Sequence, residues 1–376
     1  MKVLLVSAHS TISGANKSMC ALAEILMRNE IDVSIALRKE GDIQKEIETR
    51  GLNYIIMKNY AWTVPLNRKY NKFIFVGKII RNITFKHAVI KYLKKEKFDI
   101  VHNNSISCYL VAMCAQRIGI KTVWHFREFL EEDHMLTIPK WCRPKSIINK
   151  ASCGIAISKS IQDKYRGIYN IPIELIYNGV DVDGFYSERE ILQEDRITIA
   201  VIGRVCEGKN QIEVIDALKA LDDETLSKVQ LRIIGDKEKW SPYYSELQRH
   251  LDKRVFSKVQ LDGIIFDIIS EYRKIDVVVV PSKSEAFGRV AIEAMLSGCY
   301  VIGANTAGTD EILDDDVSTK YQLGNIEELS KVITDIIQHR DKYIEKASKG
   351  QQYAKDNFSS KRNAEKILKL YEALLE

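Results

Sequence analysis

Apolar runs and amphipathic stretches alternate along the first half of the chain. The apolar runs predict strands at Val3–Ser7, Val33–Ala36, Ile55–Met57, Ile100–His102, Thr122–His125 and Gly154–Ile157. Residues with helical spacing predict helices at Asn16–Arg28, Gln44–Arg50, Lys78–Lys95 and Ser105–Ile118. Alternation of this kind indicates βαβ units built around a parallel sheet.

The same alternation starts again in the second half. It predicts strands at Ile197–Ile202, Leu231–Ile234, Val259–Leu261, Val277–Val280 and Tyr300–Gly303. Helices are predicted at Asn210–Leu221, Tyr243–Lys253, Phe266–Tyr272 and Arg289–Leu296, followed by a last amphipathic helix at Lys361–Leu374. We therefore predict an α/β protein with two Rossmann-like, doubly wound domains that face each other across a cleft.

Turn residues and a polar segment between Asn178 and Arg196 mark the joint between the domains. We assign residues 1–180 to the first domain, 181–355 to the second, and 356–376 to a C-terminal helix that packs on one domain or crosses back to the first. Ligands of open α/β sheets bind beyond the carboxyl ends of the strands. The segments that follow the predicted strands are therefore the candidates for function.

Size and composition fit this organisation. A chain of 376 residues suits two domains, and 45% hydrophobic with 28% charged residues is typical of globular proteins. No apolar run approaches the ~18 residues of a membrane-spanning helix, and Val3–Val6 is too short for a signal peptide. Seven scattered cysteines without a CxxC pair fit a reducing compartment and argue against structural zinc. We expect a cytoplasmic protein.

Charge is distributed unevenly. Residues 1–178 contain 28 Lys and Arg against 15 Asp and Glu, and the remaining residues contain 28 against 36. The positive charge is densest in residues 66–97, where apolar positions are interleaved. The basic residues there are Arg68, Lys69, Lys72, Lys78, Arg81, Lys86, Lys91, Lys94, Lys95 and Lys97, with Glu96 as the one acid.

The basic stretch over residues 66–97 has two main interpretations. It lies on an anionic membrane surface, which would place the protein at the inner face of a membrane, or it is a solvated helix face. Nucleic acid is a weaker third interpretation because no recognised binding motif accompanies the charge. We expect a membrane surface as a partner and no nucleic acid.

The segment PSKSEAFGRVAIEA, residues 281–294, contains two carboxylates. Glu285 follows an apolar strand and lies just before a predicted helix, where free N–H groups and the helix dipole attract anions. Glu293 lies roughly two turns further along that helix. The arrangement suits a ligand with a sugar at one end and a nucleotide at the other.

The turn IGRVCEGKN, residues 202–210, carries two cations. Arg204 and Lys209 follow Gly203 at the end of a predicted strand. Two cations near a helix N-terminus can hold a diphosphate, and Arg can bind two oxygens at once. The alternative is a surface loop with ordinary charges.

Three further positions follow predicted strands. Gly14 in SAHSTISGANK permits close backbone approach or a positive φ, although a plain turn explains it equally well. His125 in VWHFRE either points into the cleft or is a structural core residue, and His102 in VHNNS is a weaker candidate. The residues after Asp262-Gly263 either seat a flat base or pack in the core.

Together and in this order, the segments resemble the retaining GT-B glycosyltransferases of family 4. The resemblance spans nearly the whole chain and is stronger in the second half. The matching motifs are SGANK, the strand-end His125, NGVD at 178–181, GRVCEGKN at 203–210, PSKSEAFGRVAIEA at 281–294 and SGCYVIGANTAGTDEIL at 297–313. The first loop departs from the family pattern with one glycine where many relatives have two, and Cys299-Tyr300 replaces a small residue and Pro.

The resemblance implies an enzyme that transfers a sugar, with retention, from a nucleoside diphosphate sugar to a glycan or lipid-linked acceptor. The pathway implied is bacterial surface polysaccharide synthesis: capsule, exopolysaccharide or cell wall. It implies that Arg204 and Lys209 bind the diphosphate. Glu285 would bind the donor sugar and Glu293 the ribose, Ile265 would border the base, and His125 would lie near the anomeric carbon. Backbone groups of a further set of residues would contact the donor: Gly14, Ala15, Gly203, Ala286, Phe287 and Gly288. The acidic run Glu128, Glu131, Glu132 and Asp133 is a solvated loop or touches an acceptor sugar.

No metal or other cofactor is expected. No Asp-x-Asp metal motif is apparent in the expected place, and the two cations that the resemblance assigns to the diphosphate make a divalent ion unnecessary. The leaving phosphate would take the proton from the attacking hydroxyl on the same face, while double displacement through a carboxylate is the rival mechanism. A non-catalytic partner subunit that binds another transferase is the alternative function. A nicotinamide enzyme is disfavoured because GxGxxG is missing.

Overall fold

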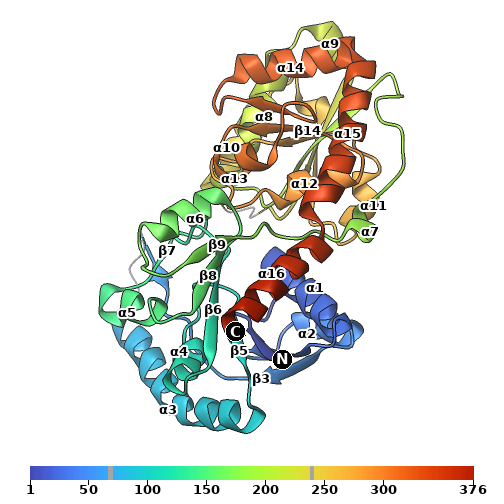
Figure 1. Cartoon of the computed structure of the whole chain (residues 1–376). Helices are drawn as coiled ribbons and strands as arrows, with labels where there is room; N and C mark the ends of the chain where they lie inside the picture. Colours follow the sequence, from blue (N-terminus) through green and yellow to red (C-terminus); the bar gives the residue numbers. More distant parts are fainter. Residues whose placement is uncertain (67–70, 238–240) are drawn as a thin grey trace. The chain divides into compact units, whose positions relative to one another are not determined.

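The computed structural model describes residues 1–66, 71–237 and 241–376. The chain divides into two compact units, one formed by Met1–Gly179 with Ser360–Glu376 and the other by Val180–Ser359 (Figure 1). Each unit has its own parallel sheet covered by helices. The prediction of two α/β domains is therefore confirmed. Arg68 and Lys69 of the basic stretch lie outside the described residues.

The first unit contains a seven-stranded parallel sheet in the order β3-β2-β1-β5-β6-β8-β9. The strands are β1 (Lys2–Val6), β2 (Asp32–Leu37), β3 (Asn53–Ile56), β5 (Ile100–Asn103), β6 (Lys121–Phe126), β8 (Cys153–Ala156) and β9 (Ile173–Leu175). The strand order reverses between β1 and β5. Their carboxyl ends therefore form the topological switch point, where ligands of such sheets bind.

Helices cover both faces of the first sheet, with α1, α2 and α16 on one face and α3 and α4 on the other (Figure 1). The helices of this unit are α1 (Gly14–Arg28), α2 (Ile43–Thr49), α3 (Lys72–Glu96), α4 (Leu110–Arg117), α5 (Pro144–Ile148), α6 (Lys159–Arg166) and α16 (Ser360–Leu375). A short antiparallel pair, β4 (Val64–Pro65) and β7 (Leu136–Thr137), and the 3-10 turn η1 (Lys140–Cys142) complete it.

Helix α16 belongs to the first unit although it ends the chain. Its buried residues Ala364, Ile367 and Tyr371 recur at helical spacing and pack in the same cluster as α1. The entry to the helix is tight, because a Cβ on Gly179 would lie 2.4 Å from Cα of Ser360. A residue larger than glycine therefore does not fit at position 179 without displacing the backbone.

The second unit contains a six-stranded parallel sheet in the order β12-β11-β10-β13-β14-β15. The strands are β10 (Ile197–Ile202), β11 (Val229–Ile234), β12 (Val259–Gly263), β13 (Val277–Val280), β14 (Tyr300–Ala304) and β15 (Thr319–Tyr321). Here the order reverses between β10 and β13. The switch point therefore lies between the two segments that carry the predicted cations and the first predicted carboxylate.

Helices also flank the second sheet, with α8, α10 and α14 packing into one core cluster and α12 lying against β13 and β14 (Figure 1). The helices of this unit are α7 (Val182–Phe185), α8 (Gln211–Lys219), α9 (Asp223–Ser227), α10 (Pro242–His250), α11 (Ile268–Tyr272), α12 (Arg289–Leu296), α13 (Ala307–Ile312), α14 (Ile326–Gln338) and α15 (Arg340–Phe358). Two 3-10 turns, η2 (Glu207–Lys209) and η3 (Phe256–Lys258), precede α8 and β12.

The predicted elements differ from the structure in several places, and α3 begins at Lys72 rather than at the predicted Lys78. The helix predicted from Ser105 begins at Leu110, because the side-chain amide of Asn103 donates to the carbonyls of Ser105 and Cys108 and holds a turn there. The helix predicted from Phe266 begins at Ile268. Residues 314–355 carry no predicted element, yet β15, α14 and most of α15 lie there.

The structure also bears on membrane insertion. In the part of the chain that the structure describes, no helix combines the length and the apolar character needed to cross a bilayer.

The packing of α16 generates a stability prediction. Ile367→Ala should lower the free energy of unfolding of the first unit by about 3 kcal/mol, because it leaves a cavity in a fully buried cluster. Lys366→Ala, on the exposed side of the same helix, is the matched control. Urea unfolding followed by tryptophan fluorescence measures the effect, since Trp62, Trp124 and Trp141 all lie in this unit. An unchanged midpoint in Ile367→Ala would contradict it.

Candidate active site

The switch point of the second sheet brings two loops together. Strands β10 and β13 pair through Ile199↔Val277 and Ala200↔Val278, so the loops that follow them leave the sheet side by side. The backbone N–H of Lys283 donates to the carbonyl of Gly208 at 2.9 Å and joins the loops directly. Residues 203–210 and 281–288, which are separated in sequence, therefore form one local surface.

Lys209 and Glu285 meet on this surface as an ion pair. The Glu285 carboxylate also accepts a hydrogen bond from the Ser282 hydroxyl at 3.2 Å. The Glu285 carbonyl accepts the N–H of Gly308 at 2.8 Å, which ties its backbone to the start of α13. With 29% of the Lys209 side chain and 19% of the Glu285 side chain exposed, the pair is held firmly but is open to a ligand.

Arg204 lies in the same loop as Lys209 and has an exposed side chain. Its guanidinium makes no ion pair or hydrogen bond with the residues described in the structure. Its carbonyl is fixed by the side-chain amide of the buried Gln211 at 3.0 Å. Gly203 precedes it with φ of +143°, a conformation that favours glycine. The backbone at Arg204 is therefore held while the cation is available for an anion.

The residues Ala286, Phe287 and Gly288 lead from Glu285 into α12. Gly288 has φ of +87°, and a Cβ there would lie 2.7 Å from Cδ1 of Ile312, so the position needs glycine. Phe287 is buried and packs edge-on against Phe358. The first N–H groups of α12 have no intrahelical acceptor, and the loop delivers them next to Glu285.

Glu293 lies on α12 and is already engaged by two donors. Arg289 Nε donates to one carboxylate oxygen at 2.5 Å, and the Tyr272 hydroxyl donates to the other at 3.2 Å. Burial, with the charge of Glu293, raises the pKa of Tyr272 well above its usual value, so Tyr272 stays a donor. A carboxylate has about four acceptor positions, so Glu293 can still accept ligand hydroxyls.

Ile265 follows β12, which lies at the edge of the second sheet. Its side chain is half-buried, whereas the neighbouring Ile264 and Phe266 are exposed. Ile264 is therefore not a core residue, and that alternative is excluded. Gly263 has φ of +80° and turns the chain at the strand end.

The first unit places Gly14 and Ala15 in the first turn of α1. Ser13 is the N-cap, and its hydroxyl accepts the N–H of Asn16. Gly14 is therefore helical, and the prediction that it lies in a loop between strand and helix is wrong. The reason is the cap: Ser13 starts the helix two residues before the predicted start at Asn16. The N–H groups of Gly14 and Ala15 belong to the turn that lacks intrahelical acceptors.

His125 is the penultimate residue of β6 and is fully buried. Its Nδ1 lies 3.0 Å from Nε2 of His102, and its Nε2 has no hydrogen-bond partner among the described residues. Burial, and secondarily the charge of Arg127, lowers the pKa of His102 to about 3 and that of His125 well below its usual value. Both rings are therefore neutral at physiological pH.

Polar residues absent from the predicted site surround this strand end. Arg127 donates to Asn104 Oδ1 at 2.8 Å and to Asn178 Oδ1 at 2.5 Å. Ser105 donates to the buried Glu128, whose pKa is raised by burial. Glu128 is thus not part of a solvated loop, whereas Glu131 and Glu132 are exposed. The polar run HNNS directly after an apolar strand was the signal for this cluster.

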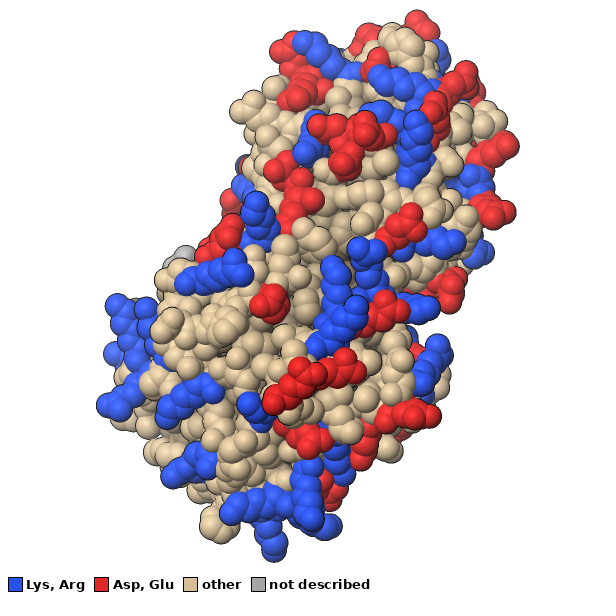
Figure 2. All heavy atoms as spheres, in the orientation of Figure 1, with Lys and Arg blue, Asp and Glu red and all other residues tan. Residues whose placement is uncertain are grey.

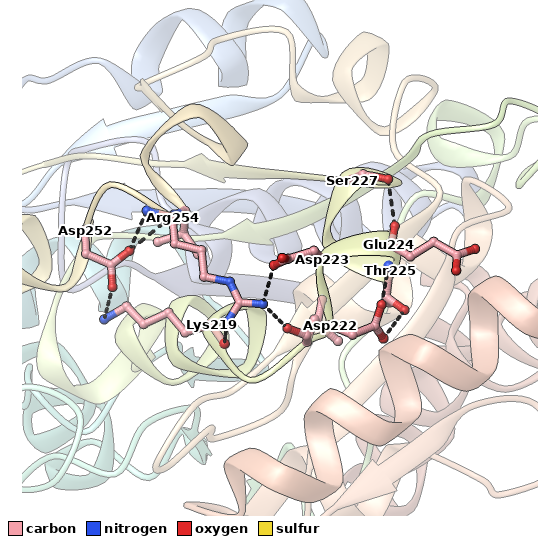
Figure 3. Close-up of polar contacts among 10 residues, drawn as sticks. Lys219, Asp222, Asp223, Glu224, Thr225, Ser227, Asp252 and Arg254 are labelled. Carbon is pink, nitrogen blue, oxygen red and sulfur yellow. Dashed lines mark hydrogen bonds and ion pairs between the residues drawn. The ribbon is translucent and has the colours of Figure 1, made fainter.

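A hollow of about 510 Å³ lies elsewhere in the second unit, between α14 and the α8–α9 turn. Figure 3 shows its neighbourhood, where Arg254 donates to the carbonyl of Lys219 and to the carboxylate of Asp223. These contacts fasten the turn before β12 to the end of α8. They lie at the amino ends of the strands, opposite the switch point, so we assign them to stability rather than to ligand binding.

Across residues 1–66, 71–237 and 241–376, no three His, Cys, Asp or Glu side chains are grouped closely enough to hold a metal ion.

Comparisons with known proteins agree with this architecture. A family model described as Glycosyltransferase Family 4 matches residues 12–183, and one described as Glycosyl transferases group 1 matches residues 184–357. A UDP-Gal:alpha-D-GlcNAc-diphosphoundecaprenol alpha-1,3-galactosyltransferase from Escherichia coli is 24% identical over 82% of this chain and 81% of its own length. The capsular polysaccharide biosynthesis glycosyltransferase CapH from Staphylococcus aureus is 20% identical over 83% of both chains.

Solved structures show the same fold. Anabaena Alr3699/HepE in complex with UDP has a TM-score of 0.82 at 20% identity and covers 99% of this chain and 100% of its own. The lipopolysaccharide outer core galactosyltransferase WaaB in its apo form has a TM-score of 0.75 at 16% identity, with 99% and 100% covered. The two family models adjoin and leave only the ends of the sequence unmatched: the chain is a glycosyltransferase and belongs to the GT-B enzymes of the family 4 type.

Proposed function

We propose that the protein transfers a sugar, with retention of anomeric configuration, from a UDP-sugar to a glycan or lipid-linked acceptor of surface polysaccharide synthesis. The observation that carries the proposal is the Lys209–Glu285 ion pair at the switch point of the second sheet. It sets a cation for the diphosphate beside a carboxylate for the sugar hydroxyls. Two similar proteins favour uridine: the E. coli relative is named for UDP-Gal, and the Anabaena structure holds UDP.

The chemistry of transfer requires stabilisation of the leaving diphosphate. Negative charge grows on it as the anomeric bond breaks, and Lys209, with the bidentate Arg204, would neutralise that charge. The first-turn amides of α12 add a positive partial charge near Glu285. Glu293 would accept the ribose hydroxyls, and Ile265 would border the base. These residues supply the electrostatic stabilisation themselves, so we propose that no metal ion is needed.

Retention is proposed because the leaving phosphate can take the proton of the attacking hydroxyl on the same face. Double displacement would need a carboxylate nucleophile against the anomeric carbon. Glu285 and Glu293 are both committed, since Glu285 pairs with Lys209 and Glu293 binds Arg289 and Tyr272. Glu128 is buried against Ser105. These commitments favour the single-face mechanism.

The relatives and the first unit support the proposed acceptor and pathway. The names of the E. coli and S. aureus relatives refer to a lipid-linked sugar and to capsular polysaccharide. Polar side chains gather at the carboxyl ends of β5 and β6, where a hydroxylated acceptor or the transferred sugar would bind. The alternative, a non-catalytic partner subunit, is disfavoured because it would have no need of a partly exposed Lys–Glu pair.

The role of Lys209 can be tested by measuring release of UDP from UDP-sugars. Lys209→Met should lower turnover about 100-fold or more, because it removes one charge that stabilises the leaving group. Lys283→Met is the matched control: Lys283 joins the same two loops through Glu207, but this pair is more exposed, at 46% and 78%. We expect Lys283→Met to keep wild-type turnover. Equal loss in both variants would contradict the assignment, as would abolition of wild-type turnover by EDTA.

Retention can be read from the first sugar released. With UDP-α-glucose as the donor probe and water as the acceptor, proton NMR at early times should show α-glucose before mutarotation. The other UDP-sugars serve as probes if glucose is not the donor sugar, and a thermal-shift screen selects among them. Initial appearance of the β anomer would refute retention.

We also propose that α3 docks the protein on an anionic membrane. Its exposed apolar residues Phe73, Val76, Ile80 and Ile83 recur at helical spacing on one side, and Phe73 is 89% exposed. Lys91, Lys94 and Lys95, in the last turns of the same helix, are exposed cations. Figure 2 shows Lys and Arg side chains over the region of α3 and α5, with few acids among them. Apolar and cationic groups on one helix suit an anionic lipid surface.

Vesicle sedimentation tests this docking. The protein should bind vesicles that contain phosphatidylglycerol, and binding should weaken as salt rises because the cations are screened. Phe73→Ser should reduce binding several-fold by removing an inserting side chain. Phe256→Ser, at an exposed phenylalanine of the second unit, should leave it unchanged. Equal binding to pure phosphatidylcholine would contradict the electrostatic contribution.

A further inference from the structure

A chain of buried polar groups runs from the C-terminal helix to the end of β6. The Tyr371 hydroxyl of α16 hydrogen-bonds Nδ1 of His102 on β5. Nε2 of His102 lies 3.0 Å from Nδ1 of His125 on β6. All three side chains are fully buried, and Nε2 of His125 ends the chain without a partner among the described residues.

The backbone explains why the three groups meet. His102 pairs in register with Val123, and His125 lies two residues beyond Val123 on the same strand. The side chains of His102, Val123 and His125 therefore point to the same face of the sheet. That face is covered by α1 and α16, and Tyr371 lies in its core cluster. The two histidines therefore stand on neighbouring strands beneath the same helix.

Hydrogen bonding in this chain allows two arrangements of protons. A neutral imidazole carries one N–H and one bare nitrogen, and burial keeps both rings neutral. In one arrangement, Tyr371 donates to His102, His102 donates from Nε2 to His125, and His125 carries its proton on Nε2. In the other, both bonds run in reverse, and Nε2 of His125 is a bare acceptor.

The Tyr371 hydroxyl decides between them. Burial raises the pKa of Tyr371 well above its usual value, so the hydroxyl keeps its proton. Within the described chain, His102 Nδ1 is its one hydrogen-bond partner. If His102 donated to Tyr371, the hydroxyl proton would be buried without an acceptor, which is unfavourable. If Tyr371 donates, the one unpaired proton is instead the Nε2–H of His125 at the carboxyl end of β6, where ligands of such sheets bind and can accept it.

We infer that Tyr371 is a positioning residue that, through His102, fixes His125 as the Nε2–H tautomer and so presents a hydrogen-bond donor at the carboxyl end of β6. The partner of that donor is an oxygen acceptor, namely a sugar hydroxyl. His125 does not act as a general base. The consequence for transfer rests on the proposed function and on the place near the anomeric carbon that the family resemblance implies for His125, whereas the tautomer itself does not.

The tautomer can be observed directly by NMR of protein labelled with ¹⁵N in histidine. At neutral pH, His102 and His125 should both show a protonated Nε2 and a bare Nδ1. Among the seven histidines, spectra of His102→Gln and His125→Gln identify the two signals. Protonation of His125 on Nδ1 in the wild type would overturn the inference, and this measurement needs no substitution at Tyr371.

Removal of the Tyr371 hydroxyl tests its part in the chain. In Tyr371→Phe the preference is lost, so the His125 signals should move toward a mixture of tautomers. Tyr165→Phe is the matched control, because it removes a buried hydroxyl that donates to the Glu128 carbonyl at 2.9 Å in the same unit. It should leave the histidine signals unchanged. Wild-type tautomers in Tyr371→Phe would overturn the inference.

Turnover separates the inference from the proposed function. In Tyr371→Phe, kcat/KM for UDP release from a UDP-sugar should fall about 10-fold, because some of the His125 rings then lack the donor and the rest are less well oriented. Affinity for UDP alone should stay the same, since the proposed UDP contacts lie on the second unit. A wild-type enzyme that shows both histidine rings protonated on Nε2 and yet turns over no UDP-sugar would support the inferred tautomers and refute the proposed function.

Discussion

The pairing of β10 with β13 is the constraint on which the candidate site depends. Parallel strands end at the same edge of a sheet, and the reversal of strand order between these two leaves their loops without an intervening helix. The loop of Lys209 and the loop of Glu285 are thereby placed against each other across 76 residues of sequence. The Gly208–Lys283 backbone bond and the Gly308–Glu285 bond then fix the second loop from both sides.

The two units use the same topology for different chemistry. The second unit presents a partly exposed ion pair and an exposed Arg204, which suit a charged, hydrated ligand. The first unit presents a buried polar network around Arg127 and neutral histidines, which suits hydroxyl groups. Burial explains the difference: it neutralises the histidines of the first unit, whereas the partly exposed ion pair of the second unit keeps both charges in reach of water.

Much of the fold could be predicted from the sequence, because buried parallel strands are continuous apolar runs such as Val277–Val280. The motif loops could be placed for the same reason, since each follows such a run. Helix α14 was missed although Leu329, Ile333 and Ile336 recur at helical spacing after the Asn325 cap. Short elements such as β15 carry too few residues to show a period.

The candidate site was less predictable where contacts join distant residues. The hydrogen bonds from Arg127 to Asn104 and Asn178 connect three separate segments, and no local sequence pattern predicts these contacts. Gly14 was misplaced because the Ser13 cap starts α1 earlier than its apolar spacing does. The contact of Tyr371 with His102 spans 269 residues, so its detection requires the tertiary structure.

That long-range contact has a consequence for biosynthesis. Helix α16 (Ser360–Leu375) leaves the ribosome after every residue of the second unit. Until then, the nascent first unit lacks a helix that covers one face of its sheet. The second unit, whose residues are continuous in sequence, can complete its core while the first still exposes apolar surface to solvent and chaperones. The first unit therefore completes its core only after every residue of the second unit has been synthesised.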